Sequence, residues 1–299
     1  MTNKWLKVAL MVTAIATGTS IKIDAETVLY VPQDDRPVSL QYTVDTAREA
    51  GMTVLTPPQH LISGKTYQGQ ADQIMAWVEQ NAGRADVMVL STDTLIYGGL
   101  VDSRKHNIPL STLQNRLKRI EGLKARNKNV RIYGFGTVMR SPRASGGGTE
   151  PAYYAEYGPT IFQIAALQDK LDSGSLTQEE TQKLMSLQAS VPVEYLQDWF
   201  DRRQKNMKIN KELIDETRSG VFDYFALGHD DTSQLSQSAL EGRYLNKYSK
   251  DISVEKYGSF PGADQLGLLL MARSRTDVSI EKPTFSVIYP LGGGGKTLP

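Results

Sequence analysis

The stretch Val221-Phe-Asp-Tyr-Phe-Ala-Leu-Gly-His-Asp-Asp231 joins an apolar, aromatic run to a polar end. Gly220 precedes the run and Gly228 ends it. A short apolar run that is bounded in this way is typical of a buried strand in a parallel sheet. The stretch therefore predicts a central strand of an α/β fold.

The polar end of this strand is a candidate functional site. His229, Asp230 and Asp231 follow the apolar run directly. In α/β sheets and barrels, chemistry takes place just beyond the carboxyl ends of the strands. Burying two carboxylates and an imidazole costs free energy that packing alone does not require. The structural alternative is that one aspartate, with Thr232 and Ser233, caps the following helix.

The chain before this stretch alternates strand patterns with helix patterns. β-branched and apolar runs are followed by polar loops and then by amphipathic segments that end near glycine. This alternation indicates a mostly parallel sheet with crossover helices, either Rossmann-like or part of a barrel. The expected strands are Glu26–Val31, Met52–Leu55, Asp86–Leu90 and Val130–Phe135, and the expected helices are Ser39–Ala50, Ala71–Gln80 and Thr112–Arg126.

The region between the fourth and fifth expected strands has a different pattern. A polar loop at Ser141–Glu150 is followed by purely helical periodicity from about Tyr153 to Thr217, with a capping box at Thr177–Glu180. We therefore expect a helical insertion at about 142–218. Later expected elements are helices at Ser236–Tyr248 and Pro261–Arg273, with Asp264 in the first turn of the second, and a last strand at Thr284–Tyr289.

The composition excludes several classes of site. The chain of 299 residues contains no cysteine, which excludes thiol catalysis, thiolate zinc sites and iron–sulfur clusters. Its 34 basic and 33 acidic residues nearly balance, so no electrostatic feature favours nucleic acid as a partner. We expect a small-molecule or glycan ligand and no cofactor.

The N-terminus has the order of charges and apolar residues of a secretory signal. Lys4 and Lys7 precede an apolar run at Val8–Gly18, and Ile23-Asp-Ala25 suits a signal peptidase. We expect residues 1–25 to be removed, which leaves an exported α/β domain at 26–299 without stable membrane insertion. The alternative is an uncleaved membrane anchor, although the apolar run is short for a bilayer.

Polar residues follow most of the expected strands, and a parallel sheet would bring them to one edge. Each has a structural alternative when taken singly, such as a local ion pair between Asp35 and Arg36, a helix cap at Asp93, or pairing of Arg104 with Asp102. Their repetition after several strands favours a shared site. The expected ligand-binding residues are Asp34, Asp35, Arg36, Asp93, Tyr97, Arg104, Arg140, His229 and Asp264, beside Asp230 and Asp231.

An adjacent carboxylate pair suits hydrolysis of N-acetylhexosaminide-type glycans. In the substrate-assisted form of glycoside hydrolysis, one carboxyl group protonates the leaving oxygen while its neighbour orients the substrate amide. We assign these roles to Asp231 and Asp230 respectively. Asp34, Arg36, Asp93 and Arg104 would then bind hydroxyl groups.

Two other functions are compatible with the same residues. Asp34, Asp93, His229 and Asp230 could bind divalent metal for phosphoester hydrolysis. A non-catalytic glycan-binding module could instead stack sugars on Tyr153, Tyr154 and Tyr157, although aromatic residues at helical spacing more often belong to a core. Gly295-Lys-Thr297 and Gly134-Phe-Gly136 lack the remaining glycines of phosphate-binding loops, and no Gly-x-Ser-x-Gly elbow occurs.

A series of motifs runs along the chain in the order Pro32–Pro37, Thr56–Pro58, Ser91–Leu100 with Ser103-Arg104, Val138–Arg140, Leu227–Asp231, Gly262–Asp264 and Ala272-Arg273. Together these motifs resemble uncharacterised bacterial proteins that are grouped as domain of unknown function 4127. The resemblance covers nearly the whole chain after residue 25, and it implies no particular activity. It also implies that relatives run well beyond Pro299, so we expect this chain to be a C-terminally truncated copy. A fainter likeness, through the Asp-Asp pair at a strand end, is to hexosaminidase-type barrels.

Overall fold

The computed structural model describes residues 26–144, 147–231, 233–279 and 284. The expected signal peptide at 1–25 lies outside the described residues. So does the expected strand at Thr284–Tyr289, apart from its first residue. Thr232, which was considered as part of a helix cap, also lies outside the described residues.

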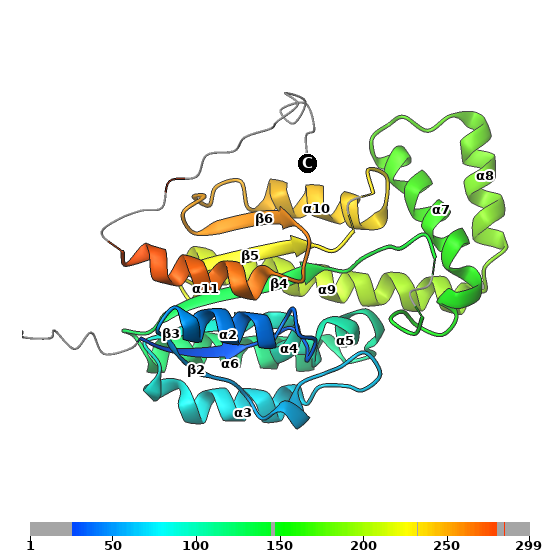
Figure 1. Cartoon of the computed structure of the whole chain (residues 1–299). Coiled ribbons are helices and arrows are strands. Elements are labelled where there is room, and N and C mark those ends of the chain that lie inside the picture. Colours follow the sequence, from blue (N-terminus) through cyan, green and yellow to red (C-terminus); the bar gives the residue numbers. More distant parts are fainter. Residues whose placement is uncertain (1–25, 145–146, 232, 280–283, 285–299) are drawn as a thin grey trace, which may run out of the picture.

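The described chain is built on a single sheet of six parallel strands (Figure 1). The strand order is β2-β1-β3-β4-β5-β6, so β2 and β6 are the two edges and the described sheet is open. The α/β prediction is confirmed in its Rossmann-like form. The strands are β1 Thr27–Val31, β2 Thr53–Leu55, β3 Val87–Ser91, β4 Arg131–Val138, β5 Tyr224–His229 and β6 Tyr257–Pro261.

Helices cover both faces of the sheet (Figure 1). In β1, Leu29 and Val31 pack against α3 and α6, whereas Val28 and Tyr30 pack toward α2 and α11. This division follows from the alternation of side chains along a strand. The described helices are α2 Gln41–Glu49, η1 Gln59–Leu61, α3 Ala71–Asn81, η2 Ala82–Arg84, α4 Thr92–Tyr97, α5 Leu100–Lys105, α6 Leu110–Arg126, α7 Tyr154–Asp172, α8 Gln178–Ala189, α9 Val193–Ser219, α10 Gln237–Tyr248 and α11 Leu266–Asp277.

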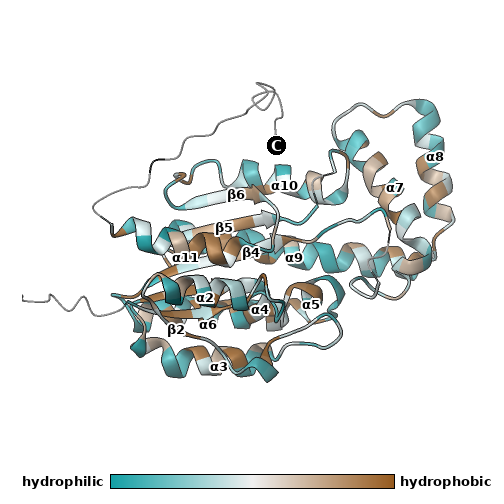
Figure 2. Cartoon of the chain, in the orientation of Figure 1, coloured by the Kyte–Doolittle hydropathy of each residue, from teal (hydrophilic) through white to brown (hydrophobic). Residues whose placement is uncertain are grey.

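The strands are buried on both faces, and their sequences are correspondingly apolar. All five residues of β3 are buried, as are the first five of β5. In Figure 2 the strands at the centre carry apolar colours, whereas polar residues colour much of α8 and α9. Burial on both faces explains why these strands read as continuous apolar runs in the sequence.

The helical segment between β4 and β5 consists of α7, α8 and α9. The expected capping box is present, because the Thr177 hydroxyl accepts from the backbone of Glu180 while the Glu180 carboxylate accepts from that of Thr177. Helix α9 packs against the sheet and serves as the crossover between β4 and β5. Helices α7 and α8 lie to one side in Figure 1 and share a separate small core around Tyr154 and Trp199.

Two expectations near the C-terminal half are wrong. Strand β6 was not expected, because it is a half-exposed edge strand that contains Gly258 and lacks a continuous apolar run. Pro261 was expected to begin a helix, but it is the last residue of β6, and α11 begins only at Leu266. Asp264 therefore lies in the turn before α11, after Gly262 with φ +93°.

The strand order places a topological switch point between β1 and β3. From β1 the chain moves to β2 on one side and then returns to β3 on the other side. The loops that follow β1 and β3 therefore diverge, which leaves a crevice at the carboxyl ends of these strands. The predicted residues Asp34, Arg36 and Asp93 lie in the segments that follow β1 and β3.

Candidate functional site

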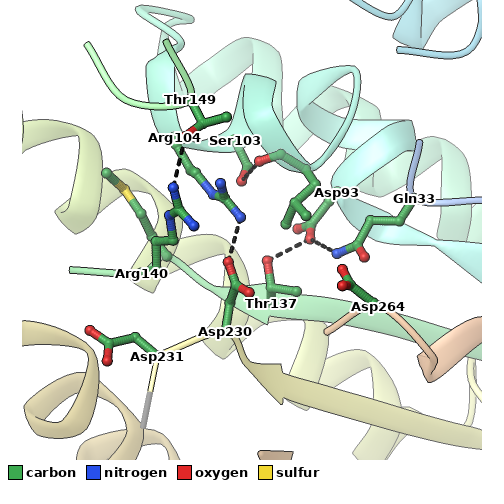
Figure 3. A network of polar contacts seen from close by, with 12 residues as sticks. Gln33, Asp93, Ser103, Arg104, Thr137, Arg140, Thr149, Asp230, Asp231 and Asp264 are labelled. Carbon is green, nitrogen blue, oxygen red and sulfur yellow. Dashed lines mark hydrogen bonds and ion pairs between the residues drawn. The ribbon is translucent and has the colours of Figure 1, made fainter. Parts of the chain in front are cut away.

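Polar side chains from several strand ends converge at the carboxyl edge of the sheet (Figure 3). Gln33 follows β1, and Asp93 lies in the first turn of α4 directly after β3. Thr137 belongs to the end of β4, and Asp230 follows β5. Of these four residues, Asp93 and Asp230 are among those that the sequence predicted for this edge of the sheet, and Gln33 and Thr137 are not.

Asp93 is a buried carboxyl group that hydrogen bonds to neutral partners. Its Oδ2 accepts from the Thr137 hydroxyl at 2.7 Å and from the Gln33 side-chain amide at 3.3 Å. Burial raises the pKa of Asp93 to about 6, and the hydrogen bonds from Thr137 and Gln33 act against that rise. The helix cap that the sequence suggested for Asp93 is instead Ser91, whose hydroxyl accepts from the Thr94 backbone at 3.3 Å.

We expect Asp93→Asn to change the pH dependence of stability. The unfolded chain loses this proton near pH 3.8 and the folded chain near pH 6, so the wild-type free energy of unfolding falls across that window and then levels. The asparagine carbonyl oxygen can accept both hydrogen bonds without titrating. The variant should gain on the order of 2–3 kcal/mol relative to wild type between pH 4 and pH 7. Urea unfolding at several pH values measures this difference, and a difference that stays flat with pH would contradict it.

Asp230 is held by a buried guanidinium group. Arg104 on α5 forms an ion pair with the Asp230 carboxylate, and only 5% of the Arg104 side chain is exposed. Burial raises the pKa of Asp230 while the Arg104 charge opposes the rise, and burial lowers the pKa of Arg104. The expected partner of Arg104, Asp102, instead accepts from the backbone of Gly69 at 3.1 Å.

Asp230 and Asp264 line one cleft of about 630 Å³, which we call the main cleft. Arg36 connects Asp264 to the loop after β1, with 2.7 Å from its Nη2 to Asp264 Oδ1 and 2.8 Å from its Nε to Asp34 Oδ2. The main cleft therefore combines two carboxylates with a largely apolar wall. Its other lining residues are Val38, Phe260, Pro261, Gly262, Ala263, Gln265, Leu266 and Leu269.

Asp231 does not join Asp230 in the main cleft, which corrects the expected adjacent pair. In Figure 3 the two carboxylates point in different directions. Asp231 accepts from the backbone of Ser233 at 2.9 Å and of Ser141 at 3.3 Å. Asp231 thus orders the turn before α10, but it is not the helix cap of the structural alternative, because the cap of α10 is Ser236, whose hydroxyl accepts from the backbone of Ala239 at 3.1 Å.

His229 also lies away from the main cleft. Its Nε2 is 2.7 Å from the Ser259 hydroxyl, and its ring covers Gly242 of α10. His229 and Asp231 line a second opening of about 330 Å³, which we call the side cleft. Burial lowers the pKa of His229, which favours the neutral imidazole.

Three further expected ligand-binding residues have other partners. The Asp35 carboxylate accepts from the Tyr67 hydroxyl. Arg140 lies beside Arg104 in Figure 3, but its Nε donates to Glu150 at 2.7 Å. Tyr97 is buried and stacks on His106 with ring centroids 4.9 Å apart. These three residues do not line the main cleft.

The sequence model of the family DUF4127, which is described as a protein of unknown function, matches residues 28–299. The chain belongs to the DUF4127 family. This match confirms the resemblance that the motifs indicated. No curated protein matches the sequence.

Two residues of this DUF4127 site were not singled out from the sequence, namely Gln33 and Thr137. Gln33 lies inside the family motif Pro32–Pro37, where the neighbouring charged residues are the stronger indication of a site. Thr137 was missed because β4 runs to Val138, beyond the expected strand end at Phe135. Both hydrogen bond to Asp93, from which they are 60 and 44 positions distant in sequence.

The four residues proposed for a metal site do not share one centre in this family member. Asp34 pairs with Arg36, Asp230 with Arg104, and His229 contacts Ser259. Within the part of the chain that the structure describes, no group of three His, Cys, Asp or Glu side chains could hold a metal ion.

The tyrosines proposed for sugar stacking belong to the core around α7. Tyr154 is fully buried and packs against Trp199 at 4.6 Å between ring centroids. Tyr153 stacks on Tyr195 at 4.7 Å, and Tyr157 also packs against Tyr195. The core interpretation is therefore confirmed for Tyr154, whereas Tyr153 and Tyr157 are only partly buried against that core. Separately, none of the described helices has both the length and the hydrophobicity needed to cross a membrane.

Proposed function

We propose that the chain is a carbohydrate-active hydrolase of amino-sugar glycans, with Asp230 and Asp264 as its two carboxyl groups. The observation that carries the proposal is that both groups, from the ends of neighbouring strands β5 and β6, line the same cleft. A pair of carboxyl groups across a scissile bond is the usual requirement for glycoside hydrolysis. In this proposal Asp230 takes the role of proton donor that the sequence had assigned to Asp231, and Asp264 becomes the second carboxyl group of the pair.

The environments of the two carboxyl groups support different roles. Burial raises the pKa of Asp230, which suits a proton donor. Asp264 is about half exposed and forms an ion pair with Arg36, which suits an ionised carboxylate. Asp230 would protonate the leaving glycosidic oxygen as the bond to the anomeric carbon breaks, while Asp264 stabilises the positive charge on the sugar ring. The Asp230 carboxylate then takes a proton from the water that attacks the anomeric carbon.

The remaining lining of the main cleft fits a sugar. Phe260, Leu266 and Leu269 form an apolar wall beside the two carboxylates. The C–H face of a sugar ring packs on such a wall, while its hydroxyl groups need the polar side of the cleft. Arg104 and Arg36 act as positioning residues that hold Asp230 and Asp264 respectively.

A panel of fluorogenic glycosides tests this function directly. The panel should include hexosaminides with acetylated and with free amino groups, and each should be incubated with the purified chain. We expect turnover that persists after EDTA treatment. Loss of turnover with EDTA would favour a metal-dependent hydrolase, and binding without turnover would favour a glycan-binding module. A folded protein with neither turnover nor sugar binding would refute the proposal.

We also propose that the chain is exported and cleaved after Ala25, as the pattern of charges and apolar residues at 1–25 indicates. N-terminal sequencing of the protein recovered from a bacterial expression host checks this. A mature start at Glu26 is expected in the extracytoplasmic fraction. An intact N-terminus in the membrane fraction would instead show an anchor.

A further inference from the structure

We call Gln33, Asp34, Asp93 and Thr137 the floor of the main cleft, although none of them is among its lining residues. The main cleft and this floor carry more carboxylates than cations among the described residues. Asp34 and Asp264 share the single guanidinium group of Arg36, and Asp230 pairs with Arg104. Asp93 hydrogen bonds only to the neutral groups of Thr137 and Gln33. Arg140, which lies beside Arg104 in Figure 3, forms an ion pair with the buried Glu150. Four carboxyl groups therefore face two guanidinium groups, which leaves a negative excess.

Gln33 supplies a second and independent observation. Only 1% of this residue is exposed, and its Oε1 has no hydrogen-bond partner among the described residues. Its Nε2 already donates to Asp93, so the orphan atom is an acceptor. In Figure 3 this amide points toward the carboxylate of Asp264. A buried acceptor without a donor costs free energy.

We infer that the ligand of the main cleft carries a protonated amine, which would donate to Gln33 Oε1 and to the Asp264 carboxylate. An ammonium group has three donors and no acceptor, so it satisfies the orphan oxygen and offsets the negative excess. This inference rests on the proposed function and narrows it to hexosamines with a free amino group.

A neutral acetamido group fits this floor less well. Its single N–H could donate to Gln33 Oε1, but its carbonyl oxygen needs a donor in turn, and the Thr137 hydroxyl and one of the two Gln33 amide hydrogens already bond to Asp93. It also brings no charge to balance Asp264, which shares the guanidinium group of Arg36 with Asp34. A metal ion is a poorer fit than an amine, since no described group of acidic or histidine side chains could hold one.

Binding of free monosaccharides tests the inference separately from hydrolysis, because they contain no glycosidic bond to another sugar. Glucosamine, N-acetylglucosamine and glucose should be titrated into the full chain at near-neutral pH and low salt, with NMR detection, and the galacto series in parallel. We expect the free amine to bind about tenfold more tightly than either neutral sugar, as charge-assisted hydrogen bonds allow. Added salt should reduce that preference.

Two matched variants test whether Asp264 is responsible for the preference for the free amine. Asp264→Asn should remove most of the amine preference, and Asp264 is exposed enough for the substitution to spare the fold. Asp35→Asn should retain it, because Asp35 bonds to Tyr67 and does not line the main cleft. The inference would be overturned if N-acetylglucosamine or glucose bound as tightly as glucosamine or more tightly. It would also be overturned if none of the sugars bound.

The two proposals fail in distinguishable ways. A preference for the free amine without turnover of any glycoside would support the proposed ligand class and refute the proposed hydrolase activity. Turnover confined to acetylated glycosides, with no preference for the free amine in binding, would support the proposed hydrolase activity and refute the inference that the ligand carries a protonated amine.

Discussion

Replacing Asp230 by asparagine is expected to lower turnover of the best glycoside by about 10³-fold, which is within the usual contribution of a general acid. Asparagine has nearly the same shape and can still accept from Arg104, but it cannot give up a proton to the leaving oxygen. The measurement is kcat for wild type and variant, with the melting temperature of each to show that the fold is retained.

The neighbouring residue is the matched control. Asp231→Asn should keep most of the turnover, because the Asp231 carboxylate orders a turn and faces the side cleft. If Asp231→Asn lost as much turnover as Asp230→Asn, the adjacent pair expected from the sequence would be the better description. The rate of the wild type should also fall as pH rises through the raised pKa of Asp230, since the acid must be protonated.

Replacing Arg203 by methionine is expected to lower the free energy of unfolding by about 3–5 kcal/mol, as is typical when one partner of a buried ion pair is removed. Arg203 is 1% exposed and donates to both oxygens of Glu241, at 2.7 and 2.8 Å. It also donates to the backbone oxygens of Met139 at 2.6 Å and Arg140 at 3.0 Å. The variant leaves the Glu241 charge and these carbonyl groups without their donor.

Two further variants separate this pair from general effects on α9. Lys208→Met removes an exposed pair with Glu212 on the same helix and should change the free energy of unfolding by about 0.5 kcal/mol or less. Adding Glu241→Leu to Arg203→Met should recover part of the loss, because no buried charge then remains unpaired. Urea unfolding measures all three. A double variant no more stable than Arg203→Met would show that the loss comes from packing against Trp199, over which the guanidinium lies at 5.3 Å.

The position of Arg203 links stability to the site. Its bonds to the backbone of Met139 and Arg140 hold the end of β4 in place. Thr137, which hydrogen bonds to Asp93, belongs to the same strand. We therefore regard Arg203 as a support for this end of β4, from which the floor of the main cleft is built.

Local sequence patterns were sufficient to predict the class of fold and five of the strands. The runs in β1, β3 and β5 are buried on both faces, and double burial selects consecutive apolar residues that any short window reveals. The expected edge of the sheet followed from the parallel order, because every strand of a parallel sheet delivers its loop to the same side. Strand β6 lacked this signal, since an edge strand does not require apolar residues on both faces.

The partners of the polar residues were decided by the tertiary structure alone. Asp230 and Asp231 are neighbours in sequence and equally acidic, yet only Asp230 meets Arg104, which is 126 positions away. Asp264 meets Arg36 across 228 positions, and Gln33 meets Asp93 across 60. Hydrophobic periodicity records which face of an element is buried, and it contains no information about which loops meet. That choice depends on the strand order and on the packing of α5, α10 and α11, which set the direction of each side chain at the carboxyl edge.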